Sequence, residues 1–385
     1  MAFFRFPIRM PAHTDKTDQT TVRIASGIGL RGMLLSFVLC CGAAARGATT
    51  EPSAPAGSPP PVEFDIRTTN LTDAQAQALE ERIKVNPDNA HLRAQLLGYY
   101  FVREYKQPDT VEARRAHVLW MIHNRPADRF TGSPFCSIDP VIDPDGYVAA
   151  EELWKQQAEQ LPPSAAVLGN AAEFLRLHDP TAAADLLKRA EAVDPKNPQW
   201  PSDLASLHSR PMPSTKPAGQ TDLAQLALAE FEKAFALSVS PEDRFYNLTP
   251  LPKAAFAAGD NAKATNYAIQ LLVQARSFKG DWNYGNAVHT ANLILGRVAL
   301  ASGDIDTAKA RLLEAGKTPG SPQLDSFGPN MELARDLLQK RERDVVLQYF
   351  SLCAKFWTMG TDKLDLWTRT VKAGEIPDFG ANLDY

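Results

Sequence analysis

Cysteine is scarce in this sequence, with four among 385 residues. Cys40 and Cys41 belong to an apolar run near the N-terminus, which leaves Cys136 and Cys353 in the rest of the chain. Two cysteines do not form a disulfide framework, although an exported protein could pair them. The sequence also lacks a Cys-x-x-Cys motif and any cysteine–histidine cluster, so we predict no metal site.

The sequence also lacks an excess of positive charge. Its 41 lysines and arginines are outnumbered by 45 aspartates and glutamates, which gives a formal net charge of −4. A nucleic-acid-binding protein would need at least a local basic stripe. The longest basic stretch lies at 340–343, where Glu342 interrupts it and Asp344 follows. This pattern is typical of a solvated helix face, and we predict no nucleic-acid partner.

Recognisable catalytic motifs are missing as well. The sequence contains no glycine-rich phosphate loop, Gly-x-Ser-x-Gly elbow or dinucleotide fingerprint, so we predict no catalytic residue and no cofactor. The stretch 143–152 has the offsets of an EF-hand calcium loop, but Val141 stands where that loop should open with a carboxylate. A turn around Asp143 that caps the following helix explains the same residues.

An N-terminal targeting segment is present. Arg23 and Arg31 precede a short apolar run at 32–42, and small residues follow it. A basic flank, an apolar core and a small-residue exit describe a secretory signal peptide. The run is shorter than the ~20 residues that span a bilayer. We predict that residues 1–48 are a signal peptide and that the protein is exported, to the periplasm or outside the cell.

Cys41 lies where a bacterial lipoprotein would carry its acylated cysteine. The residues before it, Val38-Leu39-Cys40, depart from a lipobox because the middle position calls for a small side chain. The alternative is that both cysteines are small apolar residues of the signal core. A lipid on Cys41 would tether the protein to a membrane without a transmembrane helix.

Two regions follow the signal segment. Residues 49–66 form a proline-rich linker, because its prolines favour an extended polyproline II spacer. From 67 to 385 the pattern changes to helices separated by short stretches that contain Pro, Gly and Asp. The alternation of apolar and polar residues that marks a strand is not convincing anywhere in this region. Irregular loops are expected at 126–146 and 317–328. We therefore predict an all-α fold for this region.

The predicted helices repeat a spacing of twelve, four and three residues. The first position is a small residue on one helix. The other three positions are a small, a large and a small residue on one face of the next helix, so the two helices can pack closely. Gly-Asp pairs at 259–260 and 303–304 mark the turns. The positions in this register are Ala171, Ala183, Leu187 and Ala190; Gly296, Ala308, Leu312 and Ala315; Ala334, Val346, Phe350 and Cys353; and, in degraded copies, Ala264, Ala268 and Leu271, and Ala205, Ala227, Phe231 and Ala234.

The stretch from Leu295-Gly296 through Gly303-Asp304 to Ala315 resembles a tetratricopeptide repeat (TPR). The clearest repeats lie at 164–197, 289–322 and 327–360. The resemblance implies a superhelical solenoid of antiparallel helix pairs, interrupted by the irregular loops. Three further phrases, at 282–289, 316–331 and 376–383, are similar to a set of uncharacterised exported bacterial TPR-containing proteins. This similarity implies an exported location and a fold, but no activity.

One predicted helical face carries an unusual group of polar residues. Asn286, His289 and Asn292 are three residues apart, so they share that face. The alternatives are a ligand groove on the concave surface and a set of hydrogen bonds that brace the loop at 317–328. No carboxylate or nucleophile stands at helical spacing from His289, so we expect no catalysis there. The residues predicted to bind a ligand or partner are Trp282, Asn283, Tyr284, Asn286, His289 and Asn292.

Three functions fit these observations. The first is an exported scaffold that binds a protein or peptide partner along its concave face. The second is a glycan-active enzyme, because paired helices can also close into an α/α toroid that uses carboxylates as acid and base. The third is a structural component of an envelope assembly, tethered through the linker. Fold resemblance cannot name the partner.

Overall fold

The computed structural model describes residues 60–62, 65–210 and 217–383. The predicted signal peptide, Cys41 and most of the linker lie outside these residues. The α-helices are α2 (Asp73–Val85), α3 (Ala90–Phe101), α4 (Val111–Asn124), α5 (Pro144–Ala158), α6 (Ala165–Leu175), α7 (Pro180–Val193), α8 (Gln199–His208), α9 (Pro217–Leu237), α10 (Pro241–Leu248), α11 (Leu251–Ala257), α12 (Asn261–Ala275), α13 (Tyr284–Ala301), α14 (Ile305–Gly316), α15 (Pro322–Phe327), α16 (Glu332–Gln339), α17 (Arg343–Cys353) and α18 (Thr361–Lys372). Short 3₁₀ helices are η1 (Ile66–Asn70), η2 (Pro108–Thr110), η3 (Pro134–Cys136), η4 (Arg276–Phe278), η5 (Thr358–Gly360) and η6 (Gly380–Leu383).

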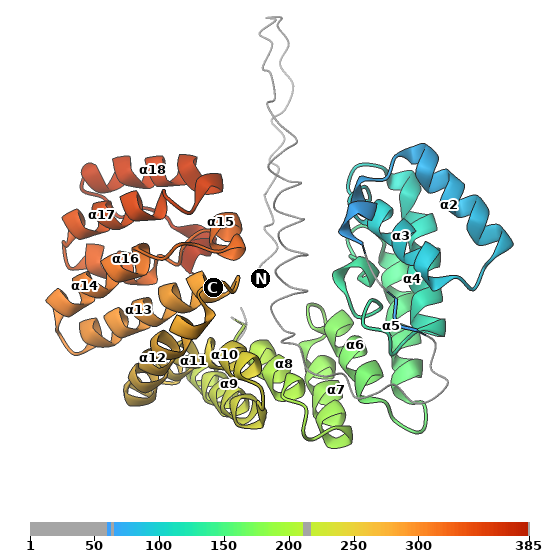
Figure 1. Cartoon of the computed structure of the whole chain (residues 1–385), viewed down its shortest axis with the longest axis horizontal. Helices are drawn as coiled ribbons and strands as arrows, with labels where there is room; N and C mark the ends of the chain where they lie inside the picture. Colours follow the sequence, from blue (N-terminus) through green and yellow to red (C-terminus); the bar gives the residue numbers. More distant parts are fainter. Residues whose placement is uncertain (1–59, 63–64, 211–216, 384–385) are drawn as a thin grey trace, which may run out of the picture.

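The helices follow one another along an open arc (Figure 1). Consecutive helices pack in pairs, α6 with α7, α8 with α9, α11 with α12 and α13 with α14, and the described residues contain no strand. The short helices α10 and α15 lie on the inner side of the arc, whereas α9 and α12 lie on its outer side (Figure 1). The prediction of an all-α, TPR-like solenoid is confirmed. The tips, α2 and α18, do not meet, so the alternative of a closed toroid is wrong.

The core runs along the arc as a succession of apolar clusters. Cluster boundaries run through α3, α8 and α13, which each contribute residues to two clusters, so the helices are buried against their neighbours rather than around one centre. The alanines and large apolar residues of the twelve-four-three register are all at most 5% exposed. Their small side chains let paired helices approach closely, which is why this spacing is visible in the sequence.

Side-chain caps determine where several helices begin. Asp260 and Asp304 each accept a hydrogen bond from the backbone N–H three residues on, at 2.8 and 3.0 Å. Asp143 does the same at the start of α5, where its Oδ1 accepts from the Gly146 N–H at 2.9 Å, and it also pairs with Arg115. The carboxylate of Asp143 is thus a helix cap held by a guanidinium, as the turn interpretation of this stretch expected.

Three first helices of pairs end in the same turn. Gly259, Gly303 and Arg341 follow α11, α13 and α16 with φ values of 81°, 86° and 68°, in the left-handed region. In each turn the next N–H donates to the carbonyl five residues back, at 2.9 to 3.0 Å, which closes the helix end. Arg341 adopts this conformation with a Cβ that glycine lacks, so its backbone is strained.

We expect Arg341→Gly to raise the free energy of unfolding by about 0.5–1 kcal/mol, because it removes the left-handed strain and keeps the turn. The increase is smaller than the strain itself, since glycine also gains entropy in the unfolded chain. Urea unfolding measures the difference. The matched control is Gly303→Arg, which should lower the same free energy, and equal stability of all three proteins would contradict the argument.

The folded body includes part of the predicted linker. Val62 is 8% exposed and belongs to the apolar cluster of α3–α8. Its N–H donates to Asp128 Oδ2 at 2.9 Å, and the Arg125 guanidinium donates to the Pro60 carbonyl at 2.5 Å. Residues 60–62 are therefore docked on the loop after α4, because an apolar side chain and a free backbone donor both find partners there.

Cys136 and Cys353 are free and buried, so they do not pair with each other. They lie in separate apolar clusters, and burial raises the pKa of both thiols. A thiol of raised pKa is a poor nucleophile and a poor metal ligand, so these two residues serve packing. None of the described helices has the length and apolar character needed to cross a membrane.

Candidate functional site on the inner side of the arc

The six residues predicted to line a groove separate into two groups. Asn283, Asn286, His289 and Asn292 are at most 9% exposed and bond to the chain itself, so they do not line an open surface. These four side chains therefore do not face an open groove: later segments cover Asn286 and His289, whereas Asn283 bonds to the earlier residue Thr249. Trp282 and Tyr284 are partly exposed, and their role in binding stays a prediction.

Asn286 braces the segment between α14 and α16. Its Nδ2 donates to Gln323 Oε1 at 2.6 Å, and its Oδ1 accepts from Ser321 Oγ at 2.6 Å. One residue earlier, the Gly285 carbonyl accepts from Thr318 Oγ1 at 2.8 Å. These bonds are the loop-bracing alternative drawn from the sequence.

His289 joins the same segment through both ring nitrogens. Nδ1 lies 3.1 Å from the Ala315 carbonyl, and the Asn330 N–H lies 3.3 Å from Nε2. A carbonyl can only accept and an N–H can only donate, so the ring is the neutral Nδ1–H tautomer. The ring also stacks near Tyr349, and burial lowers the pKa of His289 to about 4.

This histidine makes stability depend on pH in a defined window. Between about pH 4 and pH 6.5 the unfolded chain binds a proton at His289 that the folded chain does not, so stability rises with pH and is complete above 6.5. We expect this residue to contribute about 3 kcal/mol across the window. Urea unfolding from pH 4 to 7.5 should show a steeper rise for wild type than for His289→Gln; parallel curves would contradict it.

An aromatic pair lies where α10 meets the start of α13. Trp282 stacks against Tyr246 with ring centroids 6.0 Å apart and planes 21° from parallel, and both side chains are partly exposed. The Tyr246 hydroxyl donates to Asp281 Oδ2 at 2.7 Å, and the Asn283 N–H donates to Asp281 Oδ1 at 2.8 Å. We call Tyr246 and Trp282 the aromatic pair.

Hydrogen bonds fix the aromatic pair before any partner arrives. Burial and the bond to Asp281 raise the pKa of Tyr246 to about 12, so its hydroxyl remains a donor at neutral pH. Asn283 holds the other side of the turn, because its Nδ2 donates to Thr249 Oγ1 at 3.1 Å. Rigid aromatic rings lose little conformational entropy on binding, which favours them as contact residues.

Sequence reasoning missed Tyr246 and Asp281. Tyr246 belongs to α10, a short helix between the α8–α9 pair and the α11–α12 pair, and it lies 35 residues before Asp281. That separation is close to a TPR unit, so equivalent positions of neighbouring units become adjacent in the solenoid. A search for polar or aromatic residues one unit before Trp282 could have found Tyr246.

The three phrases that the sequence singled out meet in space. The first, 282–289, contacts the second, 316–331, through Asn286 and His289 as described. The second contacts the third, 376–383, because the Met331 N–H donates to the Asn382 carbonyl at 2.8 Å. Together they form one connected set of contacts within the C-terminal arm.

A buried polar cluster in the N-terminal arm offers no free catalytic group. Arg93 donates to His117 Nδ1 at 2.9 Å, so Nε2 carries the proton and lies 3.0 Å from Glu80 Oε1. Tyr100 also donates to Glu80, and although burial raises the pKa of Glu80, these bonds leave it below its ordinary value. Both ring nitrogens of His117 are occupied, so the imidazole cannot act as a base.

Surface hollows in the described part of the chain are shallow. One lies between α9 and α12, and the other between η1 and α2, and both open to solvent. No group of three His, Cys, Asp or Glu side chains among the described residues could hold a metal ion. The aromatic pair is therefore the candidate site, and its chemistry is that of contact and stacking.

Solved structures similar to this chain include one of a human protein. No family model and no curated protein matches the chain. A solved structure, a human IFIT1 dimer with PPP-AAAA, aligns with a TM-score of 0.41 at 14% identity, over 78% of this chain and 67% of that one. From its own helix pairs and buried register, the chain is an all-helical, TPR-like solenoid.

Proposed function

We propose that this protein is an exported scaffold that binds a peptide segment or a partner protein along the inner face of its arc. The observation that carries the proposal is the aromatic pair, which is partly exposed and lies where the inner helix α10 meets the start of α13. Tryptophan and tyrosine supply much of the energy in protein interfaces, since each buries a large rigid surface.

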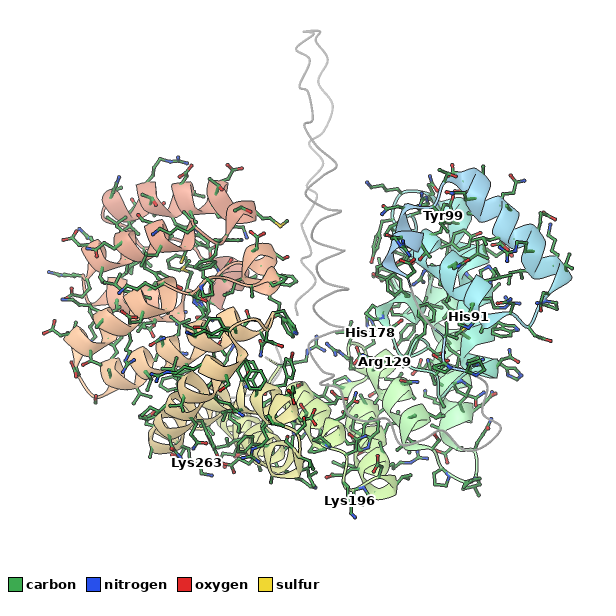
Figure 2. All side chains as sticks on the ribbon, in the orientation of Figure 1. His91, Tyr99, Arg129, His178, Lys196 and Lys263 are labelled. Atoms are coloured by element: carbon green, nitrogen blue, oxygen red, sulfur yellow. The ribbon has the colours of Figure 1, made fainter. Side chains whose placement is uncertain are left out.

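The inner face of the N-terminal arm offers a second contact area. Figure 2 shows His178 and Arg129 on the inner side of that arm, whereas Lys196 and Lys263 lie on the outer edge. His178 is exposed, and its ring packs edge-on against Tyr147 at 5.1 Å between centroids. Tyr147 in turn stacks on Phe174 at 5.2 Å. A partner spanning the arc would meet the aromatic pair at α10 and the His178 imidazole on the N-terminal arm.

Replacing Trp282 tests the proposal. Peptides selected from a random display library on the mature wild-type protein should bind Trp282→Ala at least tenfold more weakly, a loss of about 1.4 kcal/mol, in fluorescence polarisation. The matched control is Tyr105→Ala, which truncates a 49% exposed aromatic residue on the other arm and should bind as wild type does. Selected peptides that bind all three proteins equally would refute the aromatic pair as the site.

Whether the protein is exported and whether its complex is permanent are tested by separate measurements. The N-terminal basic, apolar and small-residue pattern supports export, and mass spectrometry of the native protein should find a chain that begins near residue 49. An acylated Cys41 at the N-terminus would instead show a lipid-anchored protein. A permanent role in an envelope assembly would differ from a transient scaffold in the lifetime of the complex, which a dissociation rate measures.

A further inference from the structure

Two carboxylates flank the aromatic pair of Tyr246 and Trp282. Asp281 directly precedes Trp282, and its Oδ2 accepts the Tyr246 hydroxyl at 2.7 Å. Glu242 lies four residues before Tyr246 in α10, so the two side chains project from the same face of that helix. Glu242 is exposed, and Asp281 is partly exposed. The two acids and the two rings therefore lie around one point on the surface.

The negative charge of both carboxylates acts on the Tyr246 ring. Burial is the largest cause of the raised pKa of Tyr246, followed by the hydrogen bond to Asp281 and the charge of that carboxylate. The charge of Glu242 raises the same pKa. Because a charge shifts a neighbouring pKa mainly at short range, Glu242 is close to the hydroxyl as well as on its helix face.

Neither carboxylate has a basic partner within the described part of the chain. The ion-paired lysines and arginines of α9, α12 and α13 are bonded to other acids. Arg244, the basic residue of α10, holds its guanidinium over the Phe235 ring, 4.4 Å from the centroid. Lys279 is exposed and pairs with neither acid. No described side chain therefore neutralises the negative charge beside the rings.

We propose that the aromatic pair and these two carboxylates bind an arginine side chain of the partner, so that the segment recognised by the scaffold is basic. This inference rests on the proposed function, whose site it shares. A guanidinium is attracted to the face of an indole or phenol ring. Its N–H groups lie in its plane and donate to carboxylates at its edge, so one side chain can use both parts of the site. A lysine would meet the charge but stack less well.

Peptides selected from a display library on the wild-type protein test the partner side. Those that lose binding to Trp282→Ala should share an arginine. Replacing that arginine by citrulline keeps its shape and removes its charge, and should weaken binding about tenfold in fluorescence polarisation. Trp282-dependent peptides that bind equally well with citrulline would overturn this inference and leave the scaffold and its site standing. Peptides that bind without any need of Trp282 would refute both.

Salt separates charge from stacking in the same assay. Raising the salt concentration from about 50 to 500 mM screens exposed charges, so the arginine peptide should bind more weakly. The citrulline peptide should change little, because its stacking on the rings carries no net charge. Equal salt dependence of the two peptides would contradict a charged contact at this site.

Glu242→Gln tests the protein side, because it keeps the rings and the size of the side chain while removing one charge. The arginine peptide should bind this variant at least threefold more weakly, and the citrulline peptide should bind it as it binds wild type. The matched control is Glu112→Gln, since both glutamates are exposed and lie in the first turn of a helix. An equal loss of arginine-peptide binding in both variants, or no loss in either, would overturn the role of Glu242.

Discussion

Arg114→Met should lower the free energy of unfolding by about 3–5 kcal/mol, the effect of leaving a buried charge without its partner. Arg114 and Glu104 form an ion pair at 3.1 Å between side chains that are 3% and 7% exposed. The guanidinium also donates to the Phe135 and Ser137 carbonyls, at 3.1 and 2.6 Å. Methionine fills a similar volume but supplies none of these donors. Urea or thermal unfolding measures the loss.

The pH dependence of Arg114→Met identifies the cause. Burial raises the pKa of Glu104 to about 7, and Arg114 opposes that rise, so without Arg114 the folded protein favours the protonated acid more strongly. A raised folded pKa means stability falls as pH rises above the unfolded value near 4.5, so the loss should be larger at pH 8 than at pH 5. Adding Glu104→Gln to Arg114→Met should recover part of the lost free energy of unfolding.

An exposed ion pair provides the control for this prediction. Lys155 and Glu151 pair at 2.9 Å on α5, with side chains 58% and 22% exposed. Solvent screens such a pair, so Lys155→Met should cost less than about 1 kcal/mol. Comparable losses for Arg114→Met and Lys155→Met would show that burial of the first pair contributes nothing.

Gly285→Ala should destabilise the protein by about 3 kcal/mol, although alanine is the better helix former by about 1 kcal/mol. Gly285 lies in the first turn of α13, and a Cβ there would come within 1.8 Å of the Gly320 carbonyl oxygen and 2.5 Å of its carbon. Both atoms are backbone, so no rotamer change relieves the clash. The segment braced by Asn286 would have to move, which breaks its hydrogen bonds to α13.

Two other glycines separate this clash from ordinary glycine effects. Nothing lies within 4 Å of a Cβ at Gly280, so Gly280→Ala should change stability little. At Gly296 an added Cβ meets Leu333 Cδ2 at 2.4 Å, and a flexible side chain can yield, so Gly296→Ala should cost less than Gly285→Ala. Equal unfolding free energies for the variants at 280 and 285 would mean that the segment containing Gly320 can move away from α13 without an energetic cost.

The helix pairs and their register could be predicted because their determinants are local. Ala308, Leu312 and Ala315 are fully buried, and their spacing on one face of α14 reports that burial directly. Gly303-Asp304 likewise specifies its own turn, since glycine takes the left-handed φ and aspartate caps the next helix. Arg341 in the equivalent turn shows the limit of prediction from local sequence. There the surrounding helices impose the left-handed turn although arginine disfavours it.

The roles of individual polar residues depended on segments far away in the chain. Spacing placed Asn286 and His289 on one face of a helix, but a groove and a braced loop make the same pattern in the sequence. The segment that covers them arrives 26 to 41 residues later, at Ala315 and Asn330, and only the folded chain shows that it lies there. Tyr246 reaches Trp282 for the same reason, because the solenoid stacks residues about one repeat unit apart that no periodicity within a helix connects.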